Sequence, residues 1–286
     1  MRLHLRCLAA LLFLGTAAPS VFAQITVNRK SVTLDPASTN DPAANLTVRN
    51  GGASAVQLSV QLEDWDVDAQ GASHWRKPGA VTGSCGRRVS LSPAVMQLAP
   101  GEQRVVRVSL SASAQFDAEC WSAAVIRSTS LEPGKTRSDT AAIHATVPLY
   151  VTPSGLSVDG ELSDMYVTGD SLEVIFRNIG KVRTNIVGEI QVQTIGDSVV
   201  ATVPLDSVTV LVGATRRFRV AMPKLPPGQY LLVALVDYGG EQLTAVQAAL
   251  EIRSSSGWRV HAKAKLRAAC GCSMNFDAIL NAFRTR

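Results

Sequence analysis

The sequence predicts an all-β protein built from two consecutive antiparallel β-sandwiches and a short C-terminal extension. Apolar and polar residues alternate in many short segments between residues 24 and 252, and turn-forming residues separate these segments at regular intervals. No segment of this body has the periodicity of a convincing amphipathic helix. Hydrophobic residues make up 46% of the 286 residues and charged residues 18%, which is enough apolar material for two packed cores.

The chain begins with the pattern of a secretory signal. Arg2 and Arg6 precede an apolar stretch over residues 8–18, and residues 21–23 (Val-Phe-Ala) form an acceptable cleavage site before Gln24. We therefore expect residues 1–23 to be a signal peptide and the mature protein to be periplasmic or at the cell surface. No later apolar run reaches the roughly 18 residues that a membrane span requires, so no integral membrane span is expected.

Seven strands are expected before residue 153. The clearest is the stretch 56–62, in which four apolar residues alternate with three polar ones, and turn pairs such as Asp35-Pro36 and Pro100-Gly101 separate such stretches. The expected strands lie near 25–34, 44–49, 55–65, 87–98, 102–110, 120–130 and 142–152.

A second set of strands is expected from about residue 156 to 252. Residues 152–155 (Thr-Pro-Ser-Gly) look like a short linker, and residues 231–236 form a continuous apolar run. We therefore place one domain at 24–153 and another at 154–253. Each has the length of an immunoglobulin-like sandwich. In the second, residues 225–230 (Leu-Pro-Pro-Gly-Gln-Tyr) resemble fibronectin-like modules, and residues 237–240 (Asp-Tyr-Gly-Gly) resemble to the same degree the C-terminal domain of periplasmic pilus chaperones.

Residues 254–286 are expected to form a basic C-terminal tail. Apolar and basic residues alternate over 258–267, and a short helix is indicated by four apolar residues at helical spacing. Two interpretations remain open: a solvated extension, or an interaction arm that contacts an acidic surface, a membrane or a partner strand. The apolar residues of the expected helix are Phe276, Ile279, Leu280 and Phe283.

Charge is concentrated at the two ends of the chain. The net charge is +5; the signal contributes +2 and residues 253–286 contribute +6, which leaves −3 on the body. We therefore expect no basic face for nucleic acid on the folded body.

Four cysteines remain after the signal. In an oxidising compartment Cys85 and Cys120 are the expected disulfide, although four cysteines allow three pairings. That bridge closes a loop of about 35 residues and contributes roughly 3–4 kcal/mol in the chain-entropy model. Cys270 and Cys272 are either incidental thiols of the tail or a C-x-C pair for a soft metal or redox chemistry.

Asp64, Asp66 and Asp68 alternate ahead of Gly71 and form a candidate calcium site, because calcium prefers oxygen ligands. The glycine comes late for a calcium loop, and Trp75 stands where a bidentate glutamate is needed. The other interpretation is a polar hairpin between strands. No other metal and no cofactor are expected.

The sequence offers no recognisable catalytic site. His74, His144 and His261 are far apart in sequence. The sequence contains no zinc-protease motif, no nucleophile elbow and no phosphate-binding glycine loop. We therefore expect a binding protein rather than an enzyme.

In residues 92–103 a Ser-Pro-Ala-Val segment is followed by Leu-Ala-Pro-Gly-Glu-Gln. Through this segment, its most specific match, the first set of strands resembles the N-terminal domain of PapD-like periplasmic pilus-assembly chaperones. Residues 45–50, 61–65, 117–121 and 148–153 also resemble family segments in the same order. The resemblance covers about 125 residues of the chain, and the order and spacing of the motifs carry it rather than any single one.

The resemblance implies that an edge strand is donated to an unfinished pilin subunit, since such chaperones complete a client's sheet with main-chain hydrogen bonds and apolar side chains. The candidate strand has an apolar row at every second position, and Pro148 favours a sheet edge because proline donates no ladder hydrogen bond. The alternative is an ordinary last strand that buries this row in its own core. The row consists of Ile143, Ala145, Val147, Leu149 and Val151.

The family holds the client's C-terminal carboxylate with an arginine on the first strand and a lysine on the last. Arg29 matches the arginine, whereas Pro148 stands at the lysine position, and Lys135 and Arg137 in the preceding loop are substitute candidates. The predicted function is a periplasmic chaperone for pilus or surface-appendage subunits. The alternative is a structural or adhesive cell-envelope protein built from immunoglobulin-like modules.

Overall fold

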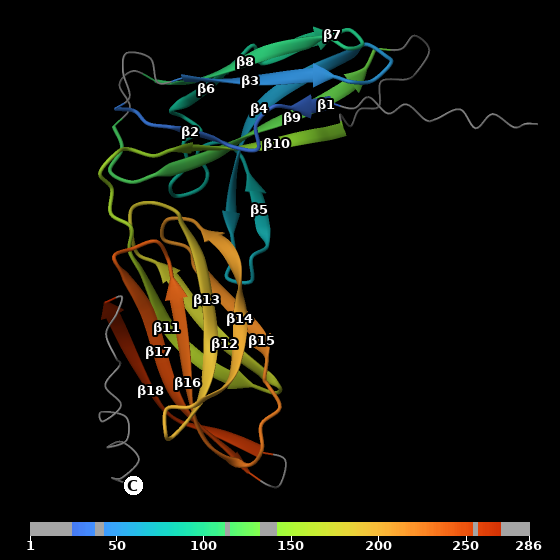
Figure 1. Cartoon of the computed structure of the whole chain (residues 1–286). Coiled ribbons are helices and arrows are strands. Elements are labelled where there is room, and N and C mark those ends of the chain that lie inside the picture. The colour runs from blue at the N-terminus through green and yellow to red at the C-terminus, as the bar shows by residue number, and fades with distance from the viewer. Residues whose placement is uncertain (1–24, 38–42, 112–114, 132–141, 254–256, 270–286) are drawn as a thin grey trace, which may run out of the picture.

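The computed structural model describes residues 25–37, 43–111, 115–131, 142–253 and 257–269, and nearly all of its regular structure is β-strand. Two β-sandwiches follow one another along the chain, the first from β1 to β10 and the second from β11 to β18 (Figure 1). This confirms the predicted all-β class. The expected signal peptide, Cys270, Cys272 and the expected short helix lie outside the described residues.

The first sandwich pairs a four-stranded sheet, in the order β1-β3-β8-β6, with a second sheet in the order β2-β10-β9-β4-β5; β7 pairs with the start of β4. Its strands are β1 (Ile25–Val27), β2 (Val32–Leu34), β3 (Ala43–Asn50), β4 (Val56–Val67), β5 (Ser73–Arg76), β6 (Val89–Ser92), β7 (Val95–Leu98), β8 (Gln103–Leu110), β9 (Cys120–Ser130) and β10 (Ala142–Val151).

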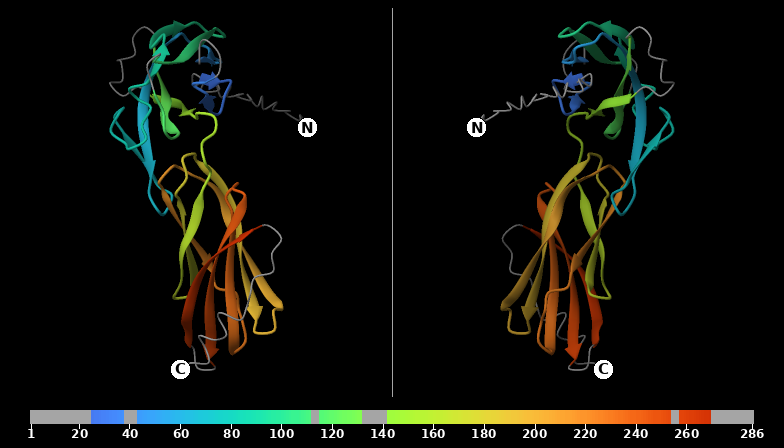
Figure 2. Two further views of the ribbon diagram at one scale, coloured as in Figure 1. Left: turned by 90° about the vertical axis from the view of Figure 1, so that its left-hand side faces the viewer. Right: turned by 90° about the vertical axis from the view of Figure 1, so that its right-hand side faces the viewer.

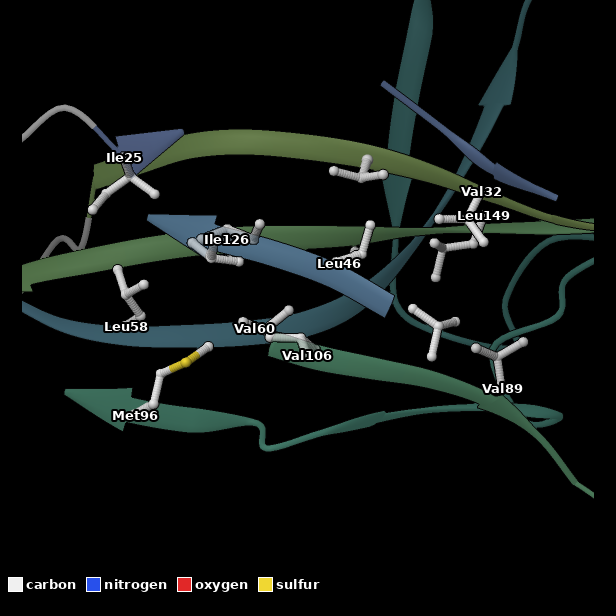
Figure 3. Close-up of a cluster of buried hydrophobic side chains, with 14 of the residues drawn as sticks. Ile25, Val32, Leu46, Leu58, Val60, Val89, Met96, Val106, Ile126 and Leu149 are labelled. Atoms are coloured by element: carbon white, nitrogen blue, oxygen red, sulfur yellow. The ribbon is translucent and has the colours of Figure 1, made fainter. Parts of the chain in front are cut away.

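Alternation along the strands builds the core between these two sheets. Leu46 on β3, Leu58 on β4 and Val106 on β8 are each fully buried, and their chain neighbours face outward. Figure 3 shows these side chains converging from both sheets. Aliphatic residues fill nearly all of this core, which is consistent with the low aromatic content of the chain.

Two segments expected as single strands are each divided. Residues 25–34 form β1 and β2, which belong to different sheets, and residues 87–98 form β6 and β7, which pair with β8 and β4 respectively. The second division lies at the cis Ser92-Pro93 bond. In both cases the chain crosses from one sheet to the other. The alternation of apolar and polar residues continues almost unchanged through the crossing, so the sequence pattern does not mark it.

A disulfide joins Cys85, in the loop before β6, to Cys120 at the start of β9, with 5.2 Å between the Cα atoms. Both residues are buried. The Cys85 amide also donates to the Trp121 carbonyl at 3.0 Å, so the loop continues the sheet beside β9.

The second sandwich packs a three-stranded sheet, β11-β12-β15, against a five-stranded sheet, β14-β13-β16-β17-β18. Its strands are β11 (Gly160–Thr168), β12 (Ser171–Asn178), β13 (Thr184–Thr194), β14 (Val199–Val210), β15 (Thr215–Ala221), β16 (Gly228–Asp237), β17 (Gln242–Arg253) and β18 (Gly257–Ala269).

The strand β18 differs from the expected solvated tail. Its backbone pairs antiparallel with β17 from Gly257 to Ala269, so the alternating segment after residue 254 is the last strand of the second sandwich. The described residues contain no helix long and apolar enough to cross a membrane.

Candidate functional site

The strand β10 is an edge strand along most of its length. It pairs antiparallel with β9 from Ala142 to Val151, whereas on its other flank the parallel partner β2 pairs only with Leu149, Tyr150 and Val151. Within the described residues no strand pairs with the outer flank of residues 142–148. An unpaired strand edge of this kind exposes backbone donors and acceptors that can accept a strand from another chain.

The predicted apolar row does not lie on one face of β10. Val147, Leu149 and Val151 are buried in the core of the first sandwich, and Ala145 packs against the same core. Between Ile143 and Ala145 the register shifts by one residue. A bulge of this kind turns the preceding side chain to the opposite face, and Ile143 is 60% exposed.

The outward face of β10 borders the open edge at one end of the strand and the second sandwich at the other. Ile143, Pro148 and Tyr150 occupy register positions opposite Arg127, Ala123 and Trp121 of β9. Ala123 and Trp121 belong to an apolar cluster that also contains Trp65 of β4 and Leu211 of the second sandwich. The open part of the edge therefore lies on the same strand as a packed contact between the two sandwiches.

Arg183 organises that contact. Its guanidinium lies over the Tyr150 ring at 3.7 Å from the centroid, and it forms an ion pair with Glu119, whose side chain is fully buried. Glu119 also accepts a hydrogen bond from the Thr152 hydroxyl at 2.6 Å. Burial raises the pKa of the Tyr150 hydroxyl, which Arg183 partly offsets. The sequence did not single out Arg183, because nothing in its local pattern indicates a partner 64 residues away.

The β4–β5 hairpin makes a second contact between the sandwiches. Figures 1 and 2 show it extending from the first sandwich toward the second. At its tip the Ala69 carbonyl accepts a hydrogen bond from the Arg217 amide of β15 at 2.7 Å. Gly71 lies so close to Arg216 that a β-carbon there would stand 1.8 Å from the guanidinium nitrogen Nη1.

Arg29 lies in the bend that joins β1 to β2, shortly before Val32, the register partner of Leu149. Its side chain is exposed and forms no ion pair with the described residues. It therefore stands near the point where β2 leaves the edge of β10. Pro148, at the position of the family's lysine, is the last residue of β10 before that pairing, and Lys135 and Arg137 lie outside the described residues.

The three aspartates of the candidate calcium site each have protein partners. Asp64 is buried and accepts hydrogen bonds from the Gly79 amide at 2.7 Å and the Ser122 hydroxyl at 2.7 Å. Asp66 lies 3.7 Å from Arg76, and Asp68 accepts from His74 at 3.0 Å. In the part of the chain that the structure describes, no group of three or more metal-ligating side chains comes together.

No known family model matches the chain, and no curated protein matches it. Among solved structures, the class 5 fimbriae chaperone CfaA is 12% identical over 77% of this chain and 97% of its own, with a TM-score of 0.48. The YadV chaperone is 12% identical over 85% of this chain and 100% of its own, with a TM-score of 0.45. A chaperone–tip adhesion subunit complex, CsuC–CsuE from Csu pili of Acinetobacter baumannii, gives 13% identity over 69% of this chain and 91% of the other, with a TM-score of 0.43.

Two of these structures are chaperones and the third is a chaperone–subunit complex, and at 12–13% identity they show a likeness of fold alone. Their identities and TM-scores are low. The functional proposal therefore rests on the geometry of this chain.

Proposed function

We propose that this protein is a periplasmic chaperone that binds pilus or surface-appendage subunits through the open edge of β10, and that it acts by binding rather than by catalysis. One observation carries the proposal: the outer flank of residues 142–148 has no partner strand among the described residues, while Ile143 is 60% exposed at that edge. A client strand pairing there gains main-chain hydrogen bonds at an already folded sheet.

The bulge changes which side chains meet the client. Val147, Leu149 and Val151 fill the core of the chaperone itself, so they position β10 rather than contact the client. Ile143 is the apolar side chain of the row that is available to fill a client groove. Arg29 supplies the one exposed cation of the expected carboxylate clamp.

Two observations favour the second candidate, a structural or adhesive envelope protein. Pro148 replaces the lysine of the two-point clamp, and three residues of the predicted donor row are buried within the chain's own sandwich. For such a protein the edge of β10 has no client.

The two candidates are distinguished by co-purification from the periplasm. The wild-type chaperone is expected to carry a stoichiometric subunit, and Ile143→Asp is expected to release it, because the variant places a charge in the client's apolar groove. Val95→Asp is the matched control: Val95 is 57% exposed on β7, away from the proposed edge. Both variants are expected to unfold at the wild-type temperature. Purification of the wild type without any subunit, or equal loss in both variants, would favour the structural role.

A further inference from the structure

A cavity of about 340 Å³ runs along the outer edge of β15, next to the tip of the β4–β5 hairpin. Its volume is at the lower end of the range typical of ligand pockets. Five consecutive residues of β15, 216–220, line it. Because successive side chains of a strand point to opposite faces, a cavity that touches all five lies along the flank of the strand. The remaining lining residues are Gln70 of the hairpin, Glu173 of β12 and Asp206 of β14.

Arg216 is the residue of this lining whose charge has no partner. Its Nε and Nη1 atoms are buried without a hydrogen bond to any described residue. The third nitrogen, Nη2, makes no such bond either and is not buried. Gly71 stands against the guanidinium on the hairpin side, and the centroid of the Phe218 ring lies 5.8 Å from its Cζ. A cation that loses water without gaining an acceptor is costly, so the position favours a ligand that supplies one.

The acidic residues of the lining do not neutralise Arg216. Glu173 is shared by Arg217 and Arg219, at 3.5 and 3.7 Å. Asp206 enters the lining from the opposite sheet and forms no ion pair with Arg216 in the described part of the chain. It is exposed, so solvent screens its repulsion of an anion. Three arginines against two acids leave one positive charge in the lining, and the charge without a partner is that of Arg216.

The backbone of β15 offers a second means of recognition beside this charge. The Arg217 amide points away from β12, because it donates to the Ala69 carbonyl of the hairpin. In a regular antiparallel ladder every second residue directs its backbone groups to the same flank, so the amide and carbonyl of Arg219 also point outward. Within the described residues no strand pairs with this flank of β15. An extended peptide in the cavity therefore continues the pairing that Ala69 begins.

We propose that this cavity binds an extended peptide segment that carries an acidic side chain. The carboxylate pairs with the Arg216 guanidinium, which it meets first at Nη2, in a charge-assisted hydrogen bond. The main chain of the segment pairs with the free flank of β15. The site belongs to the second sandwich, whereas the edge proposed for the client belongs to β10 of the first.

An NMR titration of the full chain tests the proposal. The probe is the acetylated and amidated peptide Thr-Val-Glu-Val-Thr at millimolar concentration. It is expected to shift the Nε–H resonance of Arg216 and the backbone amide of Arg219, and the same peptide with glutamine at its centre is expected to shift both severalfold less. Equal shifts with the two peptides, or no shift with either, would overturn the proposal. Inorganic phosphate that shifts both resonances as strongly as the first peptide would indicate a general anion site and would contradict the peptide assignment.

Arg216→Gln is expected to weaken binding of the glutamate peptide roughly tenfold, because one charge-assisted hydrogen bond is lost. The matched control is Arg253→Gln, which removes a half-exposed arginine of the second sandwich outside the lining and should bind the peptide like the wild type. Equal weakening in both variants would indicate attraction by overall charge and sink the proposal. Ile143→Asp should also bind like the wild type, and loss of binding there would place the peptide on β10 instead. The outcome is therefore independent of the chaperone role.

Arg216→Met tests whether the guanidinium has a structural role in the free protein. Methionine keeps an aliphatic stem and removes the charge that has no partner. The variant is therefore expected to unfold at the wild-type temperature or above it. A clear decrease in the unfolding temperature would show that the guanidinium has a protein partner in solution, which is incompatible with a site reserved for a ligand.

Discussion

Arg183 contributes to the packing of the two sandwiches through several interactions of one side chain. It pairs with the buried carboxylate of Glu119, lies over the ring of Tyr150 and donates to the Thr33 hydroxyl at 3.2 Å. Arginine suits this position because its planar guanidinium can stack on an aromatic ring while its nitrogens donate to a carboxylate. The carboxylate depends on it, since an unpaired buried charge is costly.

Replacement of Arg183 by alanine is expected to lower the free energy of unfolding by about 2–3 kcal/mol. This is below the roughly 3–5 kcal/mol that breaking a fully buried pair costs, because the Arg183 side chain is 24% exposed. The measurement is chemical denaturation followed by tryptophan fluorescence. Glu119→Gln in the Arg183→Ala background is expected to recover part of the loss, because the neutral amide no longer leaves a buried charge unpaired.

The control for Arg183 is an exposed pair in the first sandwich. Arg104 lies 2.8 Å from Glu102, and its side chain is 58% exposed. Removal of Arg104 is expected to change the unfolding free energy by no more than about 1 kcal/mol. Losses of equal size for Arg104→Ala and Arg183→Ala would contradict the role assigned to the buried pair.

At the scale of the strand, period-two alternation predicted most elements of the first sandwich but not their sheet partners. The expected strands at 44–49, 102–110 and 120–130 correspond to β3, β8 and β9. Period-two alternation of apolar residues predicts which side chains share a face of the sheet only where the pairing register of the strand is continuous. On β10 the bulge after Ile143 interrupts it, and no residue type there marks the interruption, so the candidate row was predicted as one face.

The strand β18 is a case in which the pattern was recognised but the sheet partner was not predicted. Its alternating apolar and basic residues were recognised, but the segment was interpreted as a solvated extension or an interaction arm and was not assigned to the second sandwich. In the structure Gly257 already pairs with Arg253, so β18 follows β17 directly in the same sheet. An alternating segment becomes a strand of a sheet only if a partner strand has a free edge. The sequence of residues 257–269 does not show that β17 provides such an edge. Arg183 and the hairpin contact were missed for the same reason.

The turn of the β4–β5 hairpin contains an acid-sensitive hydrogen-bond network. Asp68 accepts from the His74 ring and from the amides of Gln70 and Ala72 at 3.0 and 2.9 Å. The hydrogen bond from His74, followed by that from the Ala72 amide, lowers the pKa of the Asp68 carboxyl. A lowered folded-state pKa stabilises the turn at pH values above the unfolded pKa, and this contribution is lost as the pH falls through the folded pKa.

We therefore expect an NMR titration to give Asp68 a pKa below its ordinary value, and His74→Ala to move that pKa upward. Asp35 is the internal control. Its pKa is also lowered, mainly by the Ser154 hydroxyl, so it should not respond to the change at His74. An Asp68 pKa that is the same in both proteins would show that the His74 contact does not persist in solution.

At the scale of the whole molecule, three features of the described residues connect the two sandwiches: the linker after β10, the contact around Arg183 and the tip of the β4–β5 hairpin. The linker is itself held, because the Ser154 hydroxyl donates to Asp35 of the first sandwich. The Arg183 contact lies at the C-terminal end of β10. The hairpin meets β15, far from that point in sequence. Separate contacts of this kind restrict rotation between domains more than a linker does alone.

Gly71 provides a specific test of the hairpin contact. Its φ is +94°, and a β-carbon there would lie 2.5 Å from Cζ of Arg216, whereas Gly101 has a φ of +76° and nothing within 4 Å of such a carbon. Alanine at either position incurs a similar left-handed backbone cost of roughly 1–2 kcal/mol, but only Gly71→Ala displaces the Arg216 guanidinium from the tip of the hairpin. We expect the Arg217 amide, which donates to Ala69, to exchange its hydrogen about tenfold faster in Gly71→Ala, a loss of about 1.4 kcal/mol of protection. Gly101→Ala should leave that amide at its wild-type exchange rate. If both variants accelerate it equally, the change reflects general destabilisation, and the hairpin does not hold the second sandwich in place.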